Sequence, residues 1–296
     1  MNYKTITYIC VPQKYGQGKD GVEKGPEVLE KYGIRELFQK HSQSEVKRIG
    51  LPKPKDCERT RGERGLKNIP EVRTMNYHLR DAIAEVYSKE GIVFNIGGDH
   101  SMGTGTISGV KKANPGKKVG VIWFDAHPDI NTPESSPTGN IHGIPLACCC
   151  GIGPECLNDV MTEYISTQDI TYVGIRSIDD GEEEIIKKDG ITHFTAQQVK
   201  ECGMMKVIET IKKKYQDYDV VHLSFDIDGI DPQYIIGTGT AVPEGVSVED
   251  SLQFLRGMKE LSNLYSFDLV EFNPVIEETK TVECIMKCMR TFFGEE

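Results

Sequence analysis

Apolar residues follow two alternating patterns along the chain. Short runs rich in β-branched and aromatic residues alternate with longer stretches in which apolar residues recur at helical spacing. The short runs predict strands at 5–11, 46–51, 91–96, 118–124, 170–175, 220–225 and 265–270. The helical spacing predicts helices at 26–40, 70–89, 102–112, 182–188, 204–215, 248–261 and 278–292. Strands alternating with helices predict an α/β fold, with a parallel sheet covered by helices on both faces.

The 296 residues suit one domain, or at most two. Because the chain contains no linker, internal repeat or low-complexity segment, we expect a single domain over 1–296. The charged segment 53–65 is expected to be a solvated loop.

Three of the predicted strands end in histidine or aspartate. The run 119–124 is followed by three such residues at alternate positions, which extended backbone points to one side. The run that ends near residue 96 is followed, after a Gly-Gly turn, by one histidine. The run that ends at residue 225 is followed by two aspartates. The side chains concerned are His100, Asp125, His127, Asp129, Asp226 and Asp228. Since open parallel sheets hold their sites beyond the carboxyl ends of strands, we expect these six to converge.

This convergence indicates a metal site. One Asp-x-His-x-Asp segment alone is explained as well by a turn with solvated carboxylates, but three such strand ends in one chain are not. Four aspartates in one pocket repel one another and need protons or cations, and two divalent ions would balance them. Mixed imidazole and carboxylate ligands favour manganese, iron or zinc over magnesium or calcium. Two ions ~3.5–4 Å apart can activate a bridging water at neutral pH.

Charge and composition narrow the class of protein. The net charge of −10 argues against nucleic acid or an anionic membrane as the main partner. The apolar runs are too short for a transmembrane helix, and residues 1–10 lack the features of a signal peptide. Nine cysteines, an odd number in a large chain, do not fit a secreted disulfide framework. We therefore expect free thiols and a cytoplasmic protein.

Four segments carry a resemblance to a known family. They are GGDHS (97–101), DAHPDINTP (125–133), GNIHGIP (139–145) and SFDIDGIDP (224–232). Together they resemble the signature segments of the ureohydrolases, and DINTP followed by S-x-x-G-N-x-H-G resembles arginase within that group. The likeness extends from 21–26 to 270–274. It implies a three-layer α/β/α domain on an eight-stranded, mostly parallel sheet, and a homotrimer.

The resemblance also implies a reaction and its metals. Two Mn²⁺ ions per chain would hold a bridging hydroxide that attacks the guanidinium carbon of L-arginine, giving L-ornithine and urea. The implied ligands are His100, Asp125, Asp129 and Asp226 for one ion, and Asp125, His127, Asp226 and Asp228 for the other. Asp129 would pass a proton to the leaving amine, and His142 would be the proton shuttle. By itself a lone histidine in a loop is more often a surface residue, but an unperturbed pKa of ~6.5 suits a shuttle.

Further residues receive a role only from the resemblance. Glu271 would be a partner of the substrate guanidinium, and Thr240 would lie near the reacting centre. The expected contacts of the amino acid end of the substrate are Asn131, Ser136 and Thr138 for the α-carboxylate, and Asp179 and Glu182 for the α-amino group. Without the resemblance, the first three belong to ordinary turns, and the two acids charge a helix start.

Three positions depart from the family pattern. Pro128 stands where the family usually has threonine, and Glu249 and Asp250 occupy the positions of an interface Arg-Glu pair, which weakens the basis for a trimer. Three rival functions remain open. They are a ureohydrolase for agmatine or a guanidino acid, a dinuclear metallophosphoesterase, and a non-catalytic metal-binding protein. The phosphoesterase would need a basic phosphate cradle, and the ligand loops contain no lysine or arginine.

Overall fold

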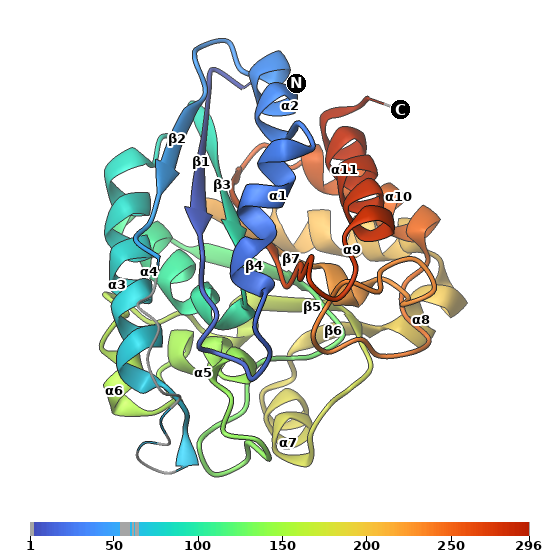
Figure 1. The fold of residues 1–296 in the computed structure, drawn as a ribbon. Coiled ribbons are helices and arrows are strands. Elements are labelled where there is room, and N and C mark those ends of the chain that lie inside the picture. The colour runs from blue at the N-terminus through green and yellow to red at the C-terminus, as the bar shows by residue number, and fades with distance from the viewer. Residues whose placement is uncertain (1–2, 54–59, 61, 63–64, 296) are drawn as a thin grey trace.

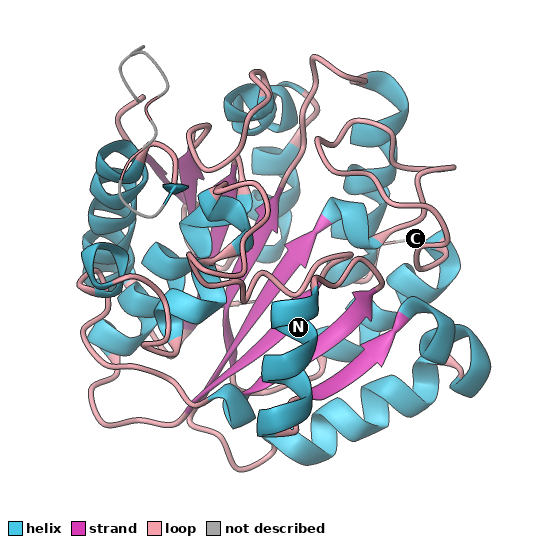
Figure 2. Ribbon diagram, turned by 90° about the horizontal axis from the view of Figure 1, so that it is seen from below, coloured by secondary structure: helices cyan, strands magenta, loops and turns pink. Residues whose placement is uncertain are grey.

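A computed structural model describes residues 3–53, 60, 62 and 65–295. Its centre is an eight-stranded sheet in the order β2-β1-β3-β8-β7-β4-β5-β6, in which every pairing is parallel (Figure 2). The strands are β1 (Thr5–Val11), β2 (Lys47–Gly50), β3 (Gly91–Gly97), β4 (Val119–Phe124), β5 (Ile170–Ile175), β6 (Thr192–Thr195), β7 (Val220–Asp226) and β8 (Leu264–Val270).

Helices cover both faces of this sheet (Figure 1). One layer packs on Phe94, Leu223 and Phe267, and consists of α1 (Gly25–Lys31), α2 (Ile34–His41), α8 (Ala196–Cys202), α9 (Met204–Tyr215), α10 (Val248–Lys259) and α11 (Thr279–Phe293). The other layer packs on Val93, Val121 and Trp123. It consists of α3 (Ile69–Val86), α4 (Gly103–Ala113), α5 (Pro145–Cys149), α6 (Glu155–Asn158) and α7 (Asp180–Asp189). The predicted three-layer α/β fold is confirmed, and the sheet is entirely rather than mostly parallel.

The order of the strands determines where a site can form. The chain builds β1, β2 and β3 on one side of the sheet, then crosses to build β4, β5 and β6 on the other. Strands β7 and β8 fill the space between β3 and β4 last. This reversal is a topological switch point, and ligands of open α/β sheets bind outside the carboxyl ends of strands at such points. The three strands that end in histidine or aspartate, β3, β4 and β7, all lie there.

Some predicted elements were wrong. The expected helix 26–40 is two helices, because the chain turns at Gly33, whose φ of 92° few residues other than glycine adopt. Strand β6 and helices α5, α6 and α8 were missed. All four residues of β6 are only half-buried, since it is an edge strand, so the apolar pattern there is weak. The predicted loop 53–65 lies largely outside the described residues.

Two expectations from composition can be examined in the described residues. No described helix combines the length and apolar character needed to cross a membrane. Eight described cysteines form no disulfide, namely Cys10, Cys148, Cys149, Cys150, Cys156, Cys202, Cys284 and Cys288. Cys57 lies outside the described residues.

Candidate metal centre and active site

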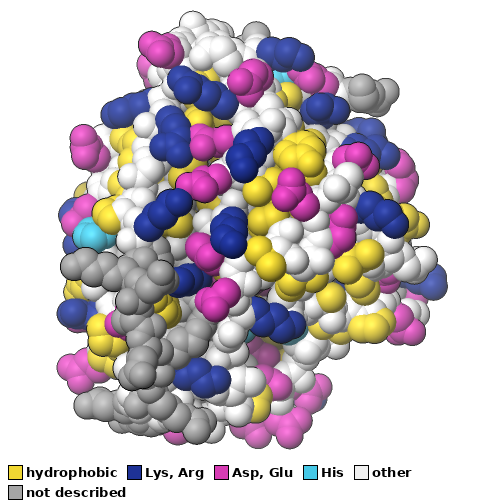
Figure 3. Space-filling view, in the orientation of Figure 1, with side chains coloured by type: hydrophobic (Ala, Val, Ile, Leu, Met, Phe, Trp, Pro, Cys, Tyr) yellow, Lys and Arg dark blue, Asp and Glu magenta, His cyan; other side chains and the backbone are white. Residues whose placement is uncertain are grey.

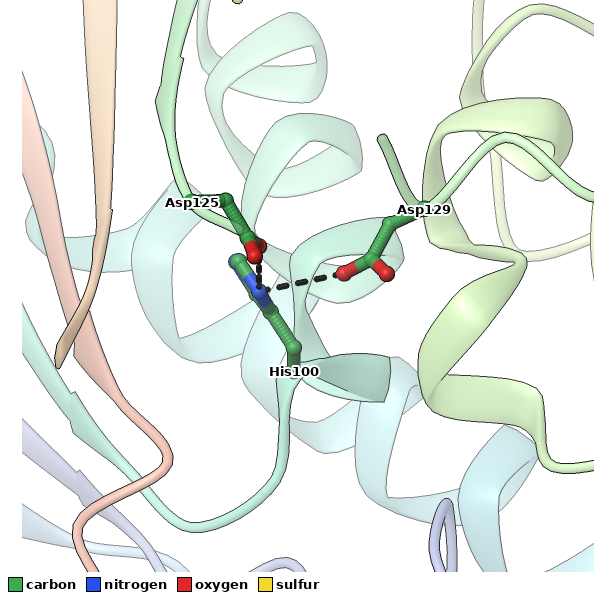
Figure 4. A group of neighbouring side chains, drawn as sticks. All are labelled: His100, Asp125 and Asp129. Atoms are coloured by element: carbon green, nitrogen blue, oxygen red, sulfur yellow. Dashed lines mark ion pairs between the residues drawn. The ribbon is translucent and has the colours of Figure 1, made fainter. Parts of the chain in front are cut away.

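His100 lies at the centre of three carboxylates. Its Nδ1 is 2.9 Å from Oδ2 of Asp125, 3.1 Å from Oδ2 of Asp129 and 3.1 Å from Oδ2 of Asp226. Figure 4 shows the first two carboxylates facing the imidazole from the end of β4 and the loop after it. All four side chains are buried. The predicted convergence of strand ends is thus present in the structure.

A second group shares one member with the first. His127 Nδ1 lies 3.4 Å from Oδ1 of Asp125 and 3.2 Å from Oδ2 of Asp228. Asp125 therefore presents one carboxylate oxygen to each histidine, as a ligand that bridges two ions would. Both groups have the donor set and spacing of a metal site. Asp226 belongs to the first group through Oδ2, while its Oδ1 accepts a hydrogen bond from the backbone N–H of Asp228 at 2.8 Å.

Two observations test whether these residues fit cations. His100 Nδ1 and Asp125 Oδ2 are buried and lack a hydrogen bond of good geometry, although they are close together. The other imidazole nitrogen, Nε2 of His100, is 2.7 Å from Oγ of Ser224. That contact leaves Nδ1 as the lone-pair nitrogen when Nε2 carries the proton, which is the usual arrangement of a metal-binding histidine. The site fits divalent cations.

The pKa values of the clustered aspartates and His100 also indicate a site for cations. Burial, together with the nearby charge of Asp125, raises the pKa of Asp129 to about 6, against the effect of His100. Burial and the charges of Asp228 and Asp125 raise the pKa of Asp226 well above its usual range. Burial would lower the pKa of His100, but its three carboxylate partners raise it well above normal. The polypeptide alone thus retains protons that cations would replace.

The backbone is strained at two of the predicted site residues. Asp129 and Glu271 have φ angles of 51° and 65°, in the left-handed region that few residues other than glycine adopt. Such conformations cost ~1–3 kcal/mol each and persist where the surrounding structure imposes them. The left-handed conformation of Asp129 comes directly after Pro128, and in it Oδ2 of Asp129 lies 3.1 Å from Nδ1 of His100.

His142 and Glu271 form a pair beside the metal ligands. His142 lies in a short 3-10 turn, and its Nδ1 is 3.2 Å from Oε1 of Glu271. The same oxygen accepts a hydrogen bond from the backbone N–H of His100 at 2.8 Å. His142 lines the cavity described below, whereas Glu271 is buried behind it and is not among the lining residues. Thr240 donates a hydrogen bond to Oδ2 of Asp228 at 2.9 Å, so it touches the cluster as expected.

A cavity of about 230 Å³ extends outward from the ligands. Most of the predicted substrate contacts line it, namely Asn131, Ser136, Thr138, Asp179, Glu182 and Thr240, together with Ser177 and Asn140, which were not predicted. Asn131 Nδ2 donates to Oδ2 of Asp179 at 2.8 Å, which links the two sets of contacts expected for the α-carboxylate and the α-amino group. The hydroxyls of Ser136 and Thr138 accept hydrogen bonds from backbone N–H groups of the same loop.

Glu182 also serves the structure at the start of α7. Its carboxylate accepts from the backbone N–H of Asp179 at 3.0 Å and from that of Ile130 at 3.1 Å. Burial raises its pKa to about 8, against the effect of these hydrogen bonds. The helix-start interpretation therefore applies to Glu182 in addition to its place on the cavity wall.

Two supporting residues were missed. Ser224 hydrogen-bonds to His100, and the indole of Trp123 stacks on the His100 ring at 4.0 Å with an interplanar angle of 3°. Both lie on the strands that carry the ligands, two residues before Asp226 and Asp125. Strand alternation places residues i and i+2 on one face, so this spacing was a usable signal.

Comparisons with known proteins agree with the site. The model of the arginase family matches residues 4–294. An arginase from Entamoeba histolytica is 53% identical over 295 residues, which are 99% of each chain. The crystal structure of Entamoeba histolytica arginase in complex with L-ornithine matches with a TM-score of 0.96 and 52% identity, covering 99% of this chain and 100% of that one. An arginase structure from Bacillus caldovelox matches with a TM-score of 0.91 and 34% identity, covering 99% of each chain. The metal-ligand geometry and this likeness along the whole chain agree, and the chain belongs to the arginase family.

Proposed function

We propose that the chain hydrolyses L-arginine to L-ornithine and urea. One observation supports this most directly. A single cavity reaches from the metal ligands to the Asn131–Asp179 pair, so it offers groups for both ends of an amino acid that carries a guanidinium. The similarity to an arginase whose crystal structure contains L-ornithine supports the same reaction.

The residues at the inner end of the cavity would hold two Mn²⁺ ions. His100, Asp129 and His127 would each bind one ion, and Asp125 would bind both, because its two oxygens face different histidines. Asp226 would be the second bridging ligand, and Asp228 would complete the set. When bound, two divalent cations lower the pKa of a water molecule between them and so supply a nucleophile at neutral pH.

The remaining chemistry is proton transfer. Asp129 lies on the cavity wall, where its carboxylate can carry a proton to the leaving amine. His142 has Nδ1 engaged with Glu271, which leaves Nε2 as the nitrogen that can exchange a proton with the substrate or with solvent. In the proposed role Glu271 orients this imidazole and places negative charge near the guanidinium. Thr240 supports Asp228.

The outer end of the cavity would select the amino acid. Asn131, Ser136 and Thr138 supply hydrogen-bonding groups for the α-carboxylate, and Asp179 and Glu182 lie where the α-amino group would bind. A site that hydrogen-bonds a polar group can reject an analogue lacking it by ~10⁴–10⁵, because its own polar groups are left unpaired.

The setting of the enzyme is also proposed. The whole chain, 1–296, would form one domain that acts in the cytoplasm on a small-molecule substrate, without nucleic acid or membrane as a partner. A homotrimer is the expected assembly, held by contacts other than the family's Arg-Glu pair, since Glu249 and Asp250 occupy those positions.

Release of urea after manganese loading tests the proposal. We expect L-arginine to be hydrolysed with a kcat/KM far above that for agmatine, which lacks the carboxylate. Equal efficiency on the two substrates would contradict arginine specificity, and no urea from either would contradict hydrolysis. Asn131→Ala should reduce activity on L-arginine more than on agmatine.

A further inference from the structure

Gly16 and Asp99 lie directly behind the main chain of His142. The backbone N–H of His142 donates to the carbonyl oxygen of Gly16 at 3.0 Å. The backbone N–H of Gly16 in turn donates to Oδ2 of Asp99 at 2.9 Å. The Asp99 side chain is fully buried. Thus one peptide segment, between β1 and α1, connects the carboxylate of Asp99 to His142.

The approach of Gly16 to Asp99 leaves no room for a side chain. A Cβ at residue 16 would lie 2.2 Å from Oδ1 of Asp99 and 2.4 Å from Oγ of Ser101. Both contacts are far inside van der Waals distance. The φ of Gly16 is not in the left-handed region, so its backbone conformation does not require glycine. It is the close packing that requires glycine here. Any residue larger than glycine must push the segment away from Asp99, and with it the carbonyl that holds His142.

Segment 98–100, which contains Asp99, also holds the imidazole of His142, through Glu271. Glu271 Oε1 accepts from the backbone N–H of His100 at 2.8 Å and lies 3.2 Å from Nδ1 of His142. The backbone N–H of Glu271 donates to the carbonyl of Gly98 at 2.9 Å. Segment 98–100 therefore fixes His142 twice, through Glu271 at the ring and through Asp99 and Gly16 at the main chain. These contacts form a closed ring of hydrogen bonds beside the cavity.

We propose that Asp99 and Gly16 are positioning residues that set the place of the His142 imidazole for proton transfer. This inference rests on the proposed hydrolysis, in which His142 moves protons. It assigns a purpose to the aspartate that precedes His100, whose carboxylate faces Gly16 and Ser101 rather than the metal ligands. A misplacement of about 1 Å can cost ~10²-fold in rate, so a small shift of this segment matters.

Gly16→Ala tests the inference, with Gly18→Ala as the matched control. Gly18 lies two residues away in the same segment, and a Cβ there meets nothing within 4 Å. We expect Gly16→Ala to lower kcat for L-arginine by about 10- to 100-fold, with KM nearly unchanged and two metal ions still bound per chain. Gly18→Ala should behave like the unmodified protein. Unchanged kcat in Gly16→Ala would overturn the proposal.

A double-mutant cycle with His142→Ala distinguishes positioning from a general defect. If Gly16 acts only through His142, adding Gly16→Ala to His142→Ala should cost no further activity. Losses that multiply would show that Gly16 acts elsewhere and would overturn the proposal. Urea release by the unmodified protein tests the proposed hydrolysis separately, because it does not depend on the variants.

Asp99→Asn gives a second route to the same answer if Gly16→Ala does not fold. The amide keeps the shape of the carboxylate but replaces one oxygen by an NH₂ group, and since Gly16 and Ser101 donate to different oxygens of Asp99, one of these hydrogen bonds must be lost. We expect the same fall in kcat, the same retention of metal, and the same lack of additivity with His142→Ala. Loss of metal or of folding in both variants would overturn the proposal, since both residues would then serve the structure alone.

Discussion

The two faces of the four central strands are filled in opposite ways. On the face under α10 and α11, Phe94, Phe124, Phe225 and Phe267 form a row of rings. The ring centroids of Phe124 and Phe225 are 4.6 Å apart, and those of Phe94 and Phe267 are 5.2 Å apart. This face also packs against the closing helix through Phe292 of α11. Burial and ring contacts of this kind stabilise the fold without involving the site.

The neighbouring residue of each strand points to the opposite face, under α4, and most of these residues carry a polar group. Asn95, Asp268, Ser224 and Trp123 are in register across β3, β8, β7 and β4. Ser224 and Trp123 support His100, and Asn95 donates to Asp268 at 2.7 Å. Among the residues that the structure describes, one oxygen of Asp268 and Nε2 of His222, which are 3.6 Å apart, have no hydrogen-bond partner. One face thus supplies stability, and the other uses buried polar groups, at a cost in stability, to hold His100.

The largest effect is expected where the polar face meets the metal site. Asp125→Ala removes the carboxylate that faces both histidines, so it should lower the occupancy of both ions and abolish most urea release. Elemental analysis checks the ion count, with Asp217→Ala, an exposed carboxylate, as the control. Two ions bound per chain in Asp125→Ala would show that Asp125 does not bridge.

On the aromatic face, Phe267→Ala should affect stability alone. Removal of a fully buried phenyl ring leaves a cavity and costs ~3–5 kcal/mol of unfolding free energy. The value of kcat should be unchanged under conditions where the variant is folded, because Phe267 belongs to the hydrophobic core on the face opposite Ser224 and Trp123. Urea denaturation measures the first quantity and urea release the second. A large fall in kcat of the folded variant would remove the distinction between the faces.

On the polar face, Asp268 should make stability depend on pH. Burial raises its pKa from 3.8 to about 7, against the effects of Asn95 and Thr106. Between these values the folded protein binds a proton that the unfolded chain has lost, so stability falls as pH rises from about 4 to 7 and stays reduced above 7. The shift corresponds to a penalty on the order of 4 kcal/mol.

Asp268→Asn removes this titration and should therefore stabilise the protein above pH 7. Burial lowers the pKa of His222 to about 3, so its neutral ring can accept a hydrogen bond from the new amide. Denaturation curves at pH 5 and pH 8 measure the difference. If the variant were less stable than the unmodified protein at pH 8, burial of the ionised Asp268 carboxylate would not cost the stability stated above.

The smallest effect is expected from Ser224→Ala, which removes the hydroxyl beside Nε2 of His100. Loss of such a supporting hydrogen bond typically lowers metal affinity ~10–100-fold. Competition with a chelator measures the change, and Ser251→Ala is the control, because this buried serine of α10 donates to the backbone carbonyl oxygen of Ser247 instead. Equal metal affinity in the two variants would show that Ser224 does not support His100.

The sequence by itself determined seven of the eight strands and the six histidine and aspartate side chains that converge at their carboxyl ends. A strand that is buried on both faces appears in the sequence as a short continuous run of apolar residues. The histidines and aspartates come directly after such runs, so they can be recognised from the sequence as well. The arginase resemblance added the roles of His142 and the substrate contacts, and the cavity contains the side chains expected to meet the substrate except Glu271.

Only the tertiary structure decided the contacts between distant segments. The edge strand β6 and the alignment of Ser224 with His100 depend on neighbours supplied from elsewhere in the chain. Gly16 and Asp99 are 83 positions apart in the sequence, and no local sequence pattern at either residue predicts their contact. Their hydrogen bond exists because parallel strands bring their carboxyl ends to one edge of the sheet, where the loops after β1 and β3 meet.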